Sequence, residues 1–338
     1  SMTLYNGGKL RNNIKSSKLQ EQVQQYSVEE EIDNIETSIT ESFLQILYAQ
    51  ESVKINEETV ALSKLQCERG KALLEAGSIS QSDYAQLESQ YSSDKYQLVL
   101  SQTTLESNIQ TLKQLLEMDM TETLSISTPI LEAHDVLTPL PGKEEVYQSA
   151  LNFIPSIQSG KLGIDIAKLE HKNAKAGYYP TLDLSASVGT GHISGSDSNF
   201  GQQMKNKLNE SIGLTLSIPI FSNRENKSAV EKAKLQISEA ELEYLNAQKE
   251  LQKTIEDIYL DATSSQAQYA AAIEQVKASK TSYNLAQEQF NLGMKNTVEL
   301  LTEKNNFLSA QQEMLQAKYM AILNAQLLRF YQGKEITL

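Results

Sequence analysis

The apolar residues of this 338-residue chain recur every seven positions along two long stretches. Such spacing is typical of the seam of a coiled coil. The stretches, residues 9–76 and 222–292, contain no proline and only one glycine, Gly70, so nothing in them ends a helix. At about 1.5 Å per residue, each helix would extend roughly 100 Å, too long for the core of a globular domain. The seam positions are Ile39, Ile46, Val53, Val60, Cys67 and Leu74 in the first stretch, and Ile255, Ala262, Tyr269, Val276, Tyr283 and Phe290 in the second.

A glycine and a second heptad series follow each stretch. Gly77 and Gly293 can take the left-handed backbone conformation that ends a helix, and the new series predicts another helix after each of them. Each half of the chain is therefore predicted to form a long helical hairpin. The second series are Tyr84, Tyr91, Leu98, Leu105 and Leu112 in one half, and Leu300, Phe307, Met314, Ala321 and Leu328 in the other.

The two hairpins are predicted to be copies of one unit. An offset of 216 residues places Tyr5 on Phe221 and Gly77 on Gly293. This offset holds without a gap over about a hundred residues, as expected for a duplicated structural unit.

The helix after each glycine begins with a capping signature. Ser80 and Asn296 can cap these helices, and an acidic residue, Asp83 or Glu299, follows three positions later, as in a capping box. One interpretation is that these carboxylates only start a helix. Another is that they are exposed at the end of a rod, where a ring of subunits would bring copies of Glu299 together around an axis.

The segment between the hairpins has a different pattern. Residues 120–142 are rich in proline and are predicted to be a connector, followed by a helix near residues 144–152 and another from Pro155 to Gly177. Apolar and polar residues then alternate, which predicts a hairpin of two amphipathic strands joined by residues 189–209, a segment without an apolar pattern. The apolar positions are Leu182, Leu184, Ala186 and Val188 in one strand, and Ile212, Leu214, Leu216, Ile218 and Ile220 in the other.

The apolar face of the strand hairpin has two interpretations. In a soluble protein it would pack on helices. Alternatively, each strand has about the 9 to 11 residues that cross a bilayer in a barrel, where the apolar face meets lipid. The chain is thus divided into a first repeat at 1–119, a connector with short helices at 120–177, the strand hairpin at 178–221 and a second repeat at 222–338.

Composition narrows the function classes. A net charge of −13 and a pI near 4.9 disfavour a nucleic-acid partner, which requires clustered basic residues. Cys67 occupies the seam slot that Tyr283 fills in the other copy, so we expect a buried core residue instead of a reactive thiol. The sequence shows no metal-ligand spacing, no glycine-rich phosphate loop and no nucleophile beside a base, so neither an enzyme, a cofactor nor a metal is predicted. It also contains neither a segment of about 20 apolar residues nor a secretory leader.

Several short stretches carry a family resemblance. They are Tyr5-Asn6-Gly7-Gly8, the paired Gly77 and Gly293, Ala150-Leu151-Asn152-Phe153-Ile154-Pro155, Tyr179-Pro180-Thr181-Leu182-Asp183-Leu184-Ser185 and Ile218-Pro219-Ile220-Phe221-Ser222-Asn223. In this order within a duplicated hairpin, they resemble the TolC-type outer-membrane efflux family over essentially the whole chain. The resemblance implies a mainly α fold of duplicated long antiparallel coiled-coil helical hairpins, of the α-barrel type. It also implies that the small amphipathic β-hairpin belongs to an outer-membrane β-barrel.

The resemblance also implies a function. A passive channel subunit would export small molecules or proteins as a homotrimer in outer-membrane lipid, extending into the periplasm of a Gram-negative bacterium. Its partners would be a periplasmic adaptor and an inner-membrane RND or ABC pump, and its gate would lie at the periplasmic helix tips. The alternative is a soluble coiled-coil scaffold or a periplasmic adaptor, although an adaptor normally has one helical hairpin, not two.

Site residues are assigned by the same resemblance. Glu299 holds the position of an acidic residue that narrows the pore in the family. A further acid of the family falls on Thr302, with Glu303 beside it. Lys295 and Asp83 match positions that help to latch neighbouring tips, and Gly77, Gly293, Ser80 and Asn296 complete the tip region proposed for latching and adaptor docking.

The repeat also leads to an expectation about what precedes residue 1. Counterparts of residues 144–218 would fall before the chain begins, so we expect about 75 further residues there in the natural protein, including the helix and strands of the first repeat. An export signal is expected ahead of them.

Overall fold

The computed structural model describes residues 1–127, 136–195 and 199–336, and its contacts group into two units. The first unit comprises Ser1–Glu30 and Ile154–Glu250, and the second comprises Glu31–Phe153 and Leu251–Leu338. Two long helices, α1 (Lys9–Glu75) and α7 (Glu225–Asn291), contribute to both units. Part of the predicted connector, residues 128–135, lies outside the described residues.

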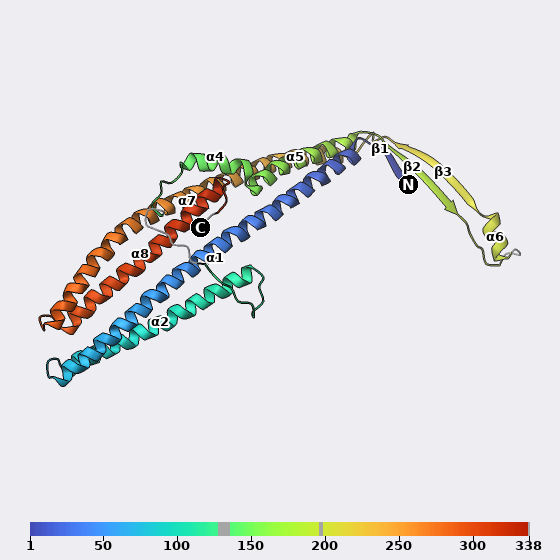
Figure 1. Cartoon of the computed structure of the whole chain (residues 1–338). Coiled ribbons are helices and arrows are strands. Elements are labelled where there is room, and N and C mark those ends of the chain that lie inside the picture. The colour runs from blue at the N-terminus through green and yellow to red at the C-terminus, as the bar shows by residue number, and fades with distance from the viewer. Residues whose placement is uncertain (128–135, 196–198, 337–338) are drawn as a thin grey trace. The chain divides into compact units, whose positions relative to one another are not determined.

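The second unit consists mainly of two antiparallel helical hairpins. Helix α1 is followed by α2 (Gln81–Leu115), and α7 is followed by α8 (Thr297–Tyr331), as the blue-to-teal and orange-to-red ribbons of Figure 1 show. Helices α1 and α7 each have 67 residues, and α2 and α8 each have 35. Every boundary therefore repeats at the offset of 216 found in the sequence. The predicted mainly α fold with duplicated hairpins is confirmed.

Apolar side chains join the two hairpins into one core. Leu47 of α1, Tyr269 of α7 and Leu315 of α8 are all at most 5% exposed and belong to one buried cluster. A second cluster lies nearer the tip of the second hairpin and contains Tyr283 and Phe290. Removing these surfaces from water is the main force that holds the helices together. Most predicted seam positions of the second copy are accordingly buried, namely Ile255, Ala262, Tyr269, Tyr283 and Phe290.

The seam of the first copy is less completely buried. Ile46 is fully buried, whereas Val53, Val60 and Leu74 are only partly covered. Cys67 is a free thiol beside Tyr84 and is also only partly buried. The prediction of a core position for Cys67 therefore overstates its burial.

The short helices after the connector form as predicted. Helix α4 (Lys143–Phe153) buries Val146 and Ala150 and packs against α8 within the second unit. Helix α5 (Pro155–Lys175) begins with proline at its first position and runs into a short 3₁₀ turn, η1 (Ala176–Tyr178), in the first unit. There, Asn173 donates to Asn13 of α1 at 2.7 Å.

The strand region has three strands instead of the predicted two. Strands β1 (Met2–Asn6), β2 (Thr181–Gly189) and β3 (Asn209–Ser217) form an antiparallel sheet in the order β1-β2-β3. The sequence predicted the second strand of the hairpin at 212–220, which corresponds to β3, but the pairing of β3 ends at Ser217, before Pro219, which has no N–H to donate to a neighbouring strand. The segment joining β2 and β3 contains a helix that was not predicted, α6 (Phe200–Asn206), capped by the side chain of Asn199.

Candidate functional site

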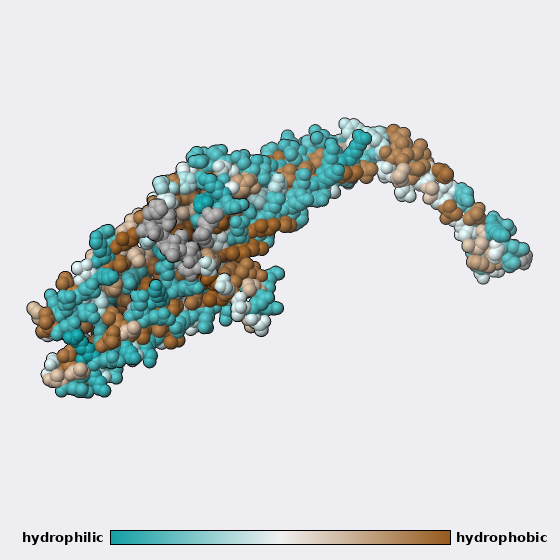
Figure 2. Space-filling model, viewed as in Figure 1, coloured by the Kyte–Doolittle hydropathy of each residue, from teal (hydrophilic) through white to brown (hydrophobic). Residues whose placement is uncertain are grey.

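The sheet has one apolar and one polar face. The register pairs Leu182 with Leu216 and Leu184 with Leu214, so the apolar side chains of both strands share one face. This face is uncovered: Leu214 is 65% exposed, and Figure 2 shows hydrophobic side chains on the surface of the strands. The interpretation in which these residues pack on helices is therefore wrong for this chain. No helix among the described residues is long and apolar enough to cross a membrane.

The other face of the sheet is lined by hydroxyl and carboxyl groups. Ser187 and Ser211 lie opposite each other and their hydroxyls are 2.8 Å apart. Thr3 of β1 donates to the carboxylate of Asp183 at 2.6 Å. The sheet is thus suited to separate an apolar phase from water.

The first helical tip is a compact turn stabilised by its own hydrogen bonds. Gly77 has a φ of 73°, and the N–H of Ser78 donates to the carbonyl of Leu73 at 2.8 Å. This bonding satisfies the last carbonyls of α1. The N–H of Asp83 donates to Ser80 Oγ at 3.1 Å, and Asp83 Oδ2 accepts from the N–H of Ser80 at 3.2 Å. The hydrogen bonds from the Ser80 side chain and backbone lower the pKa of the Asp83 carboxyl.

The second tip has the same geometry. Gly293 also has a φ of 73°, and the N–H of Met294 donates to the carbonyl of Gln289 at 2.8 Å. The N–H of Glu299 donates to Asn296 Oδ1 at 2.9 Å, and Glu299 Oε2 accepts from the N–H of Asn296 at 3.0 Å. Both predicted capping boxes are therefore present. Glu299 is also exposed, so capping the helix does not remove its carboxylate from solvent.

The two tips are neighbours. Thr297, the first residue of α8, is 1% exposed and lies close to Asp83 of the first tip, although its hydroxyl makes no hydrogen bond with the described residues. Lys295 is partly buried, and in the described part of the chain no ion pair joins it to Asp83. The role of these two residues as a latch stays a prediction.

The remaining predicted residues lie on the first turns of α8. Thr302 is exposed and its hydroxyl donates to the backbone carbonyl of Val298 at 2.8 Å. Glu303 accepts from the Ser282 hydroxyl of α7 at 2.8 Å, which links the two helices of the second hairpin. Glu299 and Thr302 are thus the members of the predicted constriction set that lie open to solvent.

Sequence reasoning missed a buried ion pair close to the tips. Lys304 of α8 is 1% exposed and its Nζ lies 2.5 Å from Asp94 of α2 and 2.6 Å from Ser63 of α1. Burial lowers the pKa of Lys304, and the hydrogen bond and charge of Asp94 oppose that shift. One signal in the sequence does point to these residues. Ser63 and Asp94 lie on heptad series of their own, beside the apolar ones, so they face the interior.

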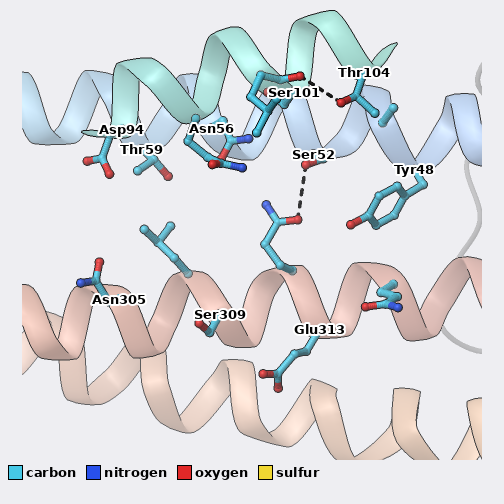
Figure 3. Close-up of a pocket in the computed structure, with 16 residues that line it drawn as sticks. Tyr48, Ser52, Asn56, Thr59, Asp94, Ser101, Thr104, Asn305, Ser309 and Glu313 are labelled. Carbon is cyan, nitrogen blue, oxygen red and sulfur yellow. Dashed lines mark hydrogen bonds between the residues drawn. The ribbon is translucent and has the colours of Figure 1, made fainter. Parts of the chain in front are cut away.

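A polar cavity of about 650 Å³ extends from this ion pair between the hairpins. Figure 3 shows Asn56 and Thr59 from the first hairpin facing Asn305 and Ser309 from α8, with Asp94 at one end. The Ser52 hydroxyl donates to Gln312 of α8 at 3.3 Å across this space. The lining side chains are mainly hydroxyl and amide groups, so this part of the contact between the hairpins is polar.

The family of this chain follows from a match to a known family model. The family model described as outer membrane efflux protein matches residues 1–117 and 146–334, which include both hairpins and the sheet. The chain belongs to the outer membrane efflux protein family. Members of this family are outer membrane proteins that act as passive channels and not as enzymes.

Individual relatives of this efflux protein are distant. It is 23% identical over 335 residues to the outer membrane efflux protein BepC of Brucella suis, an alignment that covers 95% of this chain and 69% of BepC. It is 22% identical over 296 residues to the alkaline protease secretion protein AprF of Pseudomonas aeruginosa, covering 87% of this chain and 60% of AprF. The chain therefore spans only part of the length of both relatives.

Solved structures show the same fold. The outer membrane protein VceC of Vibrio cholerae superposes with a TM-score of 0.81 at 16% identity, covering 99% of this chain and 78% of VceC. A membrane protein from Pseudomonas aeruginosa gives a TM-score of 0.82 at 14% identity, covering 98% of this chain and 73% of that protein. These values establish the fold of the efflux protein.

Proposed function

We propose that this chain is a subunit of a passive channel that exports small molecules or proteins across the outer membrane. The observation that carries the proposal is the sheet, whose apolar face is exposed while the opposite face is polar. A soluble scaffold or an adaptor would have to cover such a face, whereas a channel wall places it against lipid. The family match over both hairpins supports the same conclusion.

The channel would work within a tripartite system. A periplasmic adaptor and an inner-membrane pump, of the RND or ABC class, would deliver the substrate, and the helical hairpins would conduct it through the periplasm. The relative AprF is named for the secretion of alkaline protease, which supports protein export as one of the possible tasks. Three copies of the chain would form the wall, with the hairpin tips at the periplasmic entrance.

The tips would form the gate. Glu299 is exposed at the start of α8, and its backbone is fixed by the capping box. Copies of this carboxylate around a threefold axis would repel one another and attract cations, so they would narrow the entrance and favour cation passage. Thr302, one turn further along, would supply a neutral polar ring. Asp83 and Lys295 would contact neighbouring subunits, since no ion pair joins them to each other in the described part of one chain.

The decisive experiment separates the charge of Glu299 from its capping role. Glutamine also serves at the third position of a capping box, so Glu299→Gln removes the charge and keeps the helix start. We expect trimers of the variant in planar lipid bilayers to lose much of their cation selectivity. Asp83→Asn, at the equivalent position of the first tip, is the matched control and should change selectivity less. Unchanged selectivity in Glu299→Gln would remove this residue from the gate.

A second measurement tests the membrane assignment itself. The protein should partition into detergent micelles or lipid vesicles through the apolar face of β2 and β3. Replacing Leu214 and Leu216 with serine should reduce this partition, since both side chains are more than half exposed. A protein that stays in the aqueous phase without detergent would contradict the channel and favour a soluble scaffold.

A further inference from the structure

The buried ion pair near the tips joins three helices from both hairpins. Lys304 Nζ donates to Asp94 of α2 and to Ser63 of α1, residues that are 210 and 241 positions away in the sequence. Asp94 also accepts from Gln90 at 2.8 Å and from the Ser63 hydroxyl. The side chains of Lys304 and Asp94 are 1% and 8% exposed, so the contact is shielded from water.

Stability alone does not account for this arrangement. Moving two charges out of water is costly, and a buried pair often contributes no more than apolar residues of the same volume. A buried polar contact can form only when its groups are correctly placed, however. In coiled coils, a single buried polar residue can therefore fix the register of the helices. The cluster of Ser63, Asp94 and Lys304 is therefore better suited to set position than to add stability.

The duplicated hairpins contribute different residues to this contact. The counterpart of Asp94 in the second hairpin is Ala310, which is fully buried. The counterpart of Lys304 in the first hairpin is Glu88, which is exposed. The reciprocal ion pair is thus absent from these equivalent positions, and the cluster fixes the hairpins in one arrangement only.

Polar cavities lie on two sides of the cluster. Toward the tips, a cavity of about 450 Å³ is lined by Gln86 and Ser93 of α2 and by Thr302 of α8. Away from the tips lies the larger polar cavity of Figure 3, with Asp94 in its wall. Helices that meet through solvated hydroxyl and amide groups can shift at little cost. The ion pair between these two cavities, with side chains only 1% and 8% exposed, opposes that shift.

We propose that Ser63, Asp94 and Lys304 form a positioning cluster that fixes the start of α8 against α1 and α2, and so sets the position of Glu299 in the closed gate. Lys304 follows Glu299 by five residues, a rise of about 7.5 Å along the helix. Movement of the tip would therefore require this cluster to break. The proposal rests on the proposed gating function, and its test must separate the two.

The test measures tip position directly. Spin labels at Gln81→Cys and Val298→Cys, both exposed at the starts of α2 and α8, report the distance between the tips in a Cys67→Ser background. The key variant is Asp94→Leu with Lys304→Met, which removes both charges and retains buried apolar volume, so that folding is preserved. Lys304→Met alone is the second variant. Lys318→Met is the matched control, because it breaks another ion pair between α8 and α1, with Glu51, that is more exposed.

We expect the distance distribution to broaden or shift in the double variant and in Lys304→Met, and to be unchanged in Lys318→Met. In planar lipid bilayers, the open fraction of the double variant should rise roughly tenfold, because the closed arrangement has lost its specific contact. A double variant with the wild-type distance distribution would overturn the proposal, and so would equal broadening in Lys318→Met. Failure of the wild-type protein to conduct would instead contradict the channel function, while the spin-label distances would still test the cluster.

Discussion

The two hairpins have the same helix lengths, turns and caps, but their interiors differ in chemistry. In the second hairpin, four buried positions beside the seams are alanine, two of them in α7 and two in α8. In the first hairpin, the equivalent positions are polar or lack a side chain. The pairs, first hairpin before second, are Asn56 and Ala272, Gly70 and Ala286, Asp94 and Ala310, and Ser101 and Ala317, all of them buried.

This difference shows that the ends of the helices and the packing of their interiors are determined by different residues in a duplicated chain. Helix ends depend on backbone hydrogen bonding, which glycines and capping side chains satisfy in the same way in both copies. Interior chemistry determines which neighbour each hairpin contacts. The first hairpin uses its polar positions to bind Lys304 of the second, whereas the second hairpin contributes Tyr283, Phe290 and Leu300 to an apolar cluster that Leu62 and Leu73 of the first hairpin also contact.

The largest difference between the copies in the effect of a substitution on stability is expected at Lys304 and its counterpart, Glu88. Lys304→Met leaves the buried carboxylate of Asp94 without its cationic partner, with Gln90 and Ser63 as its remaining donors, and should reduce the free energy of unfolding by about 3–5 kcal/mol. Glu88→Met, at the exposed equivalent position, should change it by no more than about 0.5 kcal/mol. Urea unfolding followed by circular dichroism measures both. Equal effects would mean that the interiors are not different in the way described.

Apolar burial should show the next largest contrast. Leu315 is 2% exposed, whereas its counterpart Val99 in the first hairpin is 60% exposed. Leu315→Ala should cost about 2–5 kcal/mol because it leaves a cavity, and Val99→Ala should cost less than about 1 kcal/mol. The same unfolding measurement applies. A large loss for Val99→Ala would show that the first hairpin has a hidden apolar contact.

Alkaline pH should affect the second hairpin through Tyr283. Burial raises the pKa of the Tyr283 hydroxyl from 10.0 to about 12, although a hydrogen bond from Gln66 opposes the shift. Between these pH values the folded protein retains a proton that the unfolded chain loses, so stability should fall as pH rises, by up to about 1.4 kcal/mol per pH unit. Tyr283→Phe should remove this part of the pH dependence. An unchanged slope in the variant would assign the effect to another tyrosine.

The smallest effects are expected at the caps, and they should be alike in both copies. Ser80→Ala and Asn296→Ala should each cost about 1 kcal/mol, because each removes one side-chain acceptor at a helix start. The pKa of Asp83 is lowered by its bonds to Ser80, so its stabilisation is complete above its usual pKa and is lost as pH falls through the lowered value. Clearly unequal costs for the two cap variants would contradict the equivalence of the tips.

Much of this fold could be predicted from the sequence, because long helices repeat their pattern many times. The heptad series identified all four long helices, and the glycines with their capping residues identified both tips. The role of Glu299 in the gate remains a prediction, since it depends on copies of the chain meeting around an axis. Short elements were less accessible: the five residues of β1 and the seven of α6 are too few to show a period.

The buried cluster at Lys304 was missed for a different reason. Its partners lie more than 200 positions away in the sequence, and no local pattern reports such a contact. The useful sign was an aspartate, Asp94, at an interior heptad position, where a charge requires a partner. Searching duplicated chains for charges that replace alanine in one copy would have found Asp94.

The equal lengths of the two hairpins constrain how such a protein can evolve. Asp83 and Thr297 are neighbours, so the tips end at the same level. Deleting three residues from α1 alone would draw the first tip back by about 4.5 Å and separate it from the second. Insertions and deletions in one copy are therefore tolerated only when the other copy changes by the same number of residues. Changes in rod length should accordingly appear in pairs across the family, while point substitutions in each seam can accumulate independently.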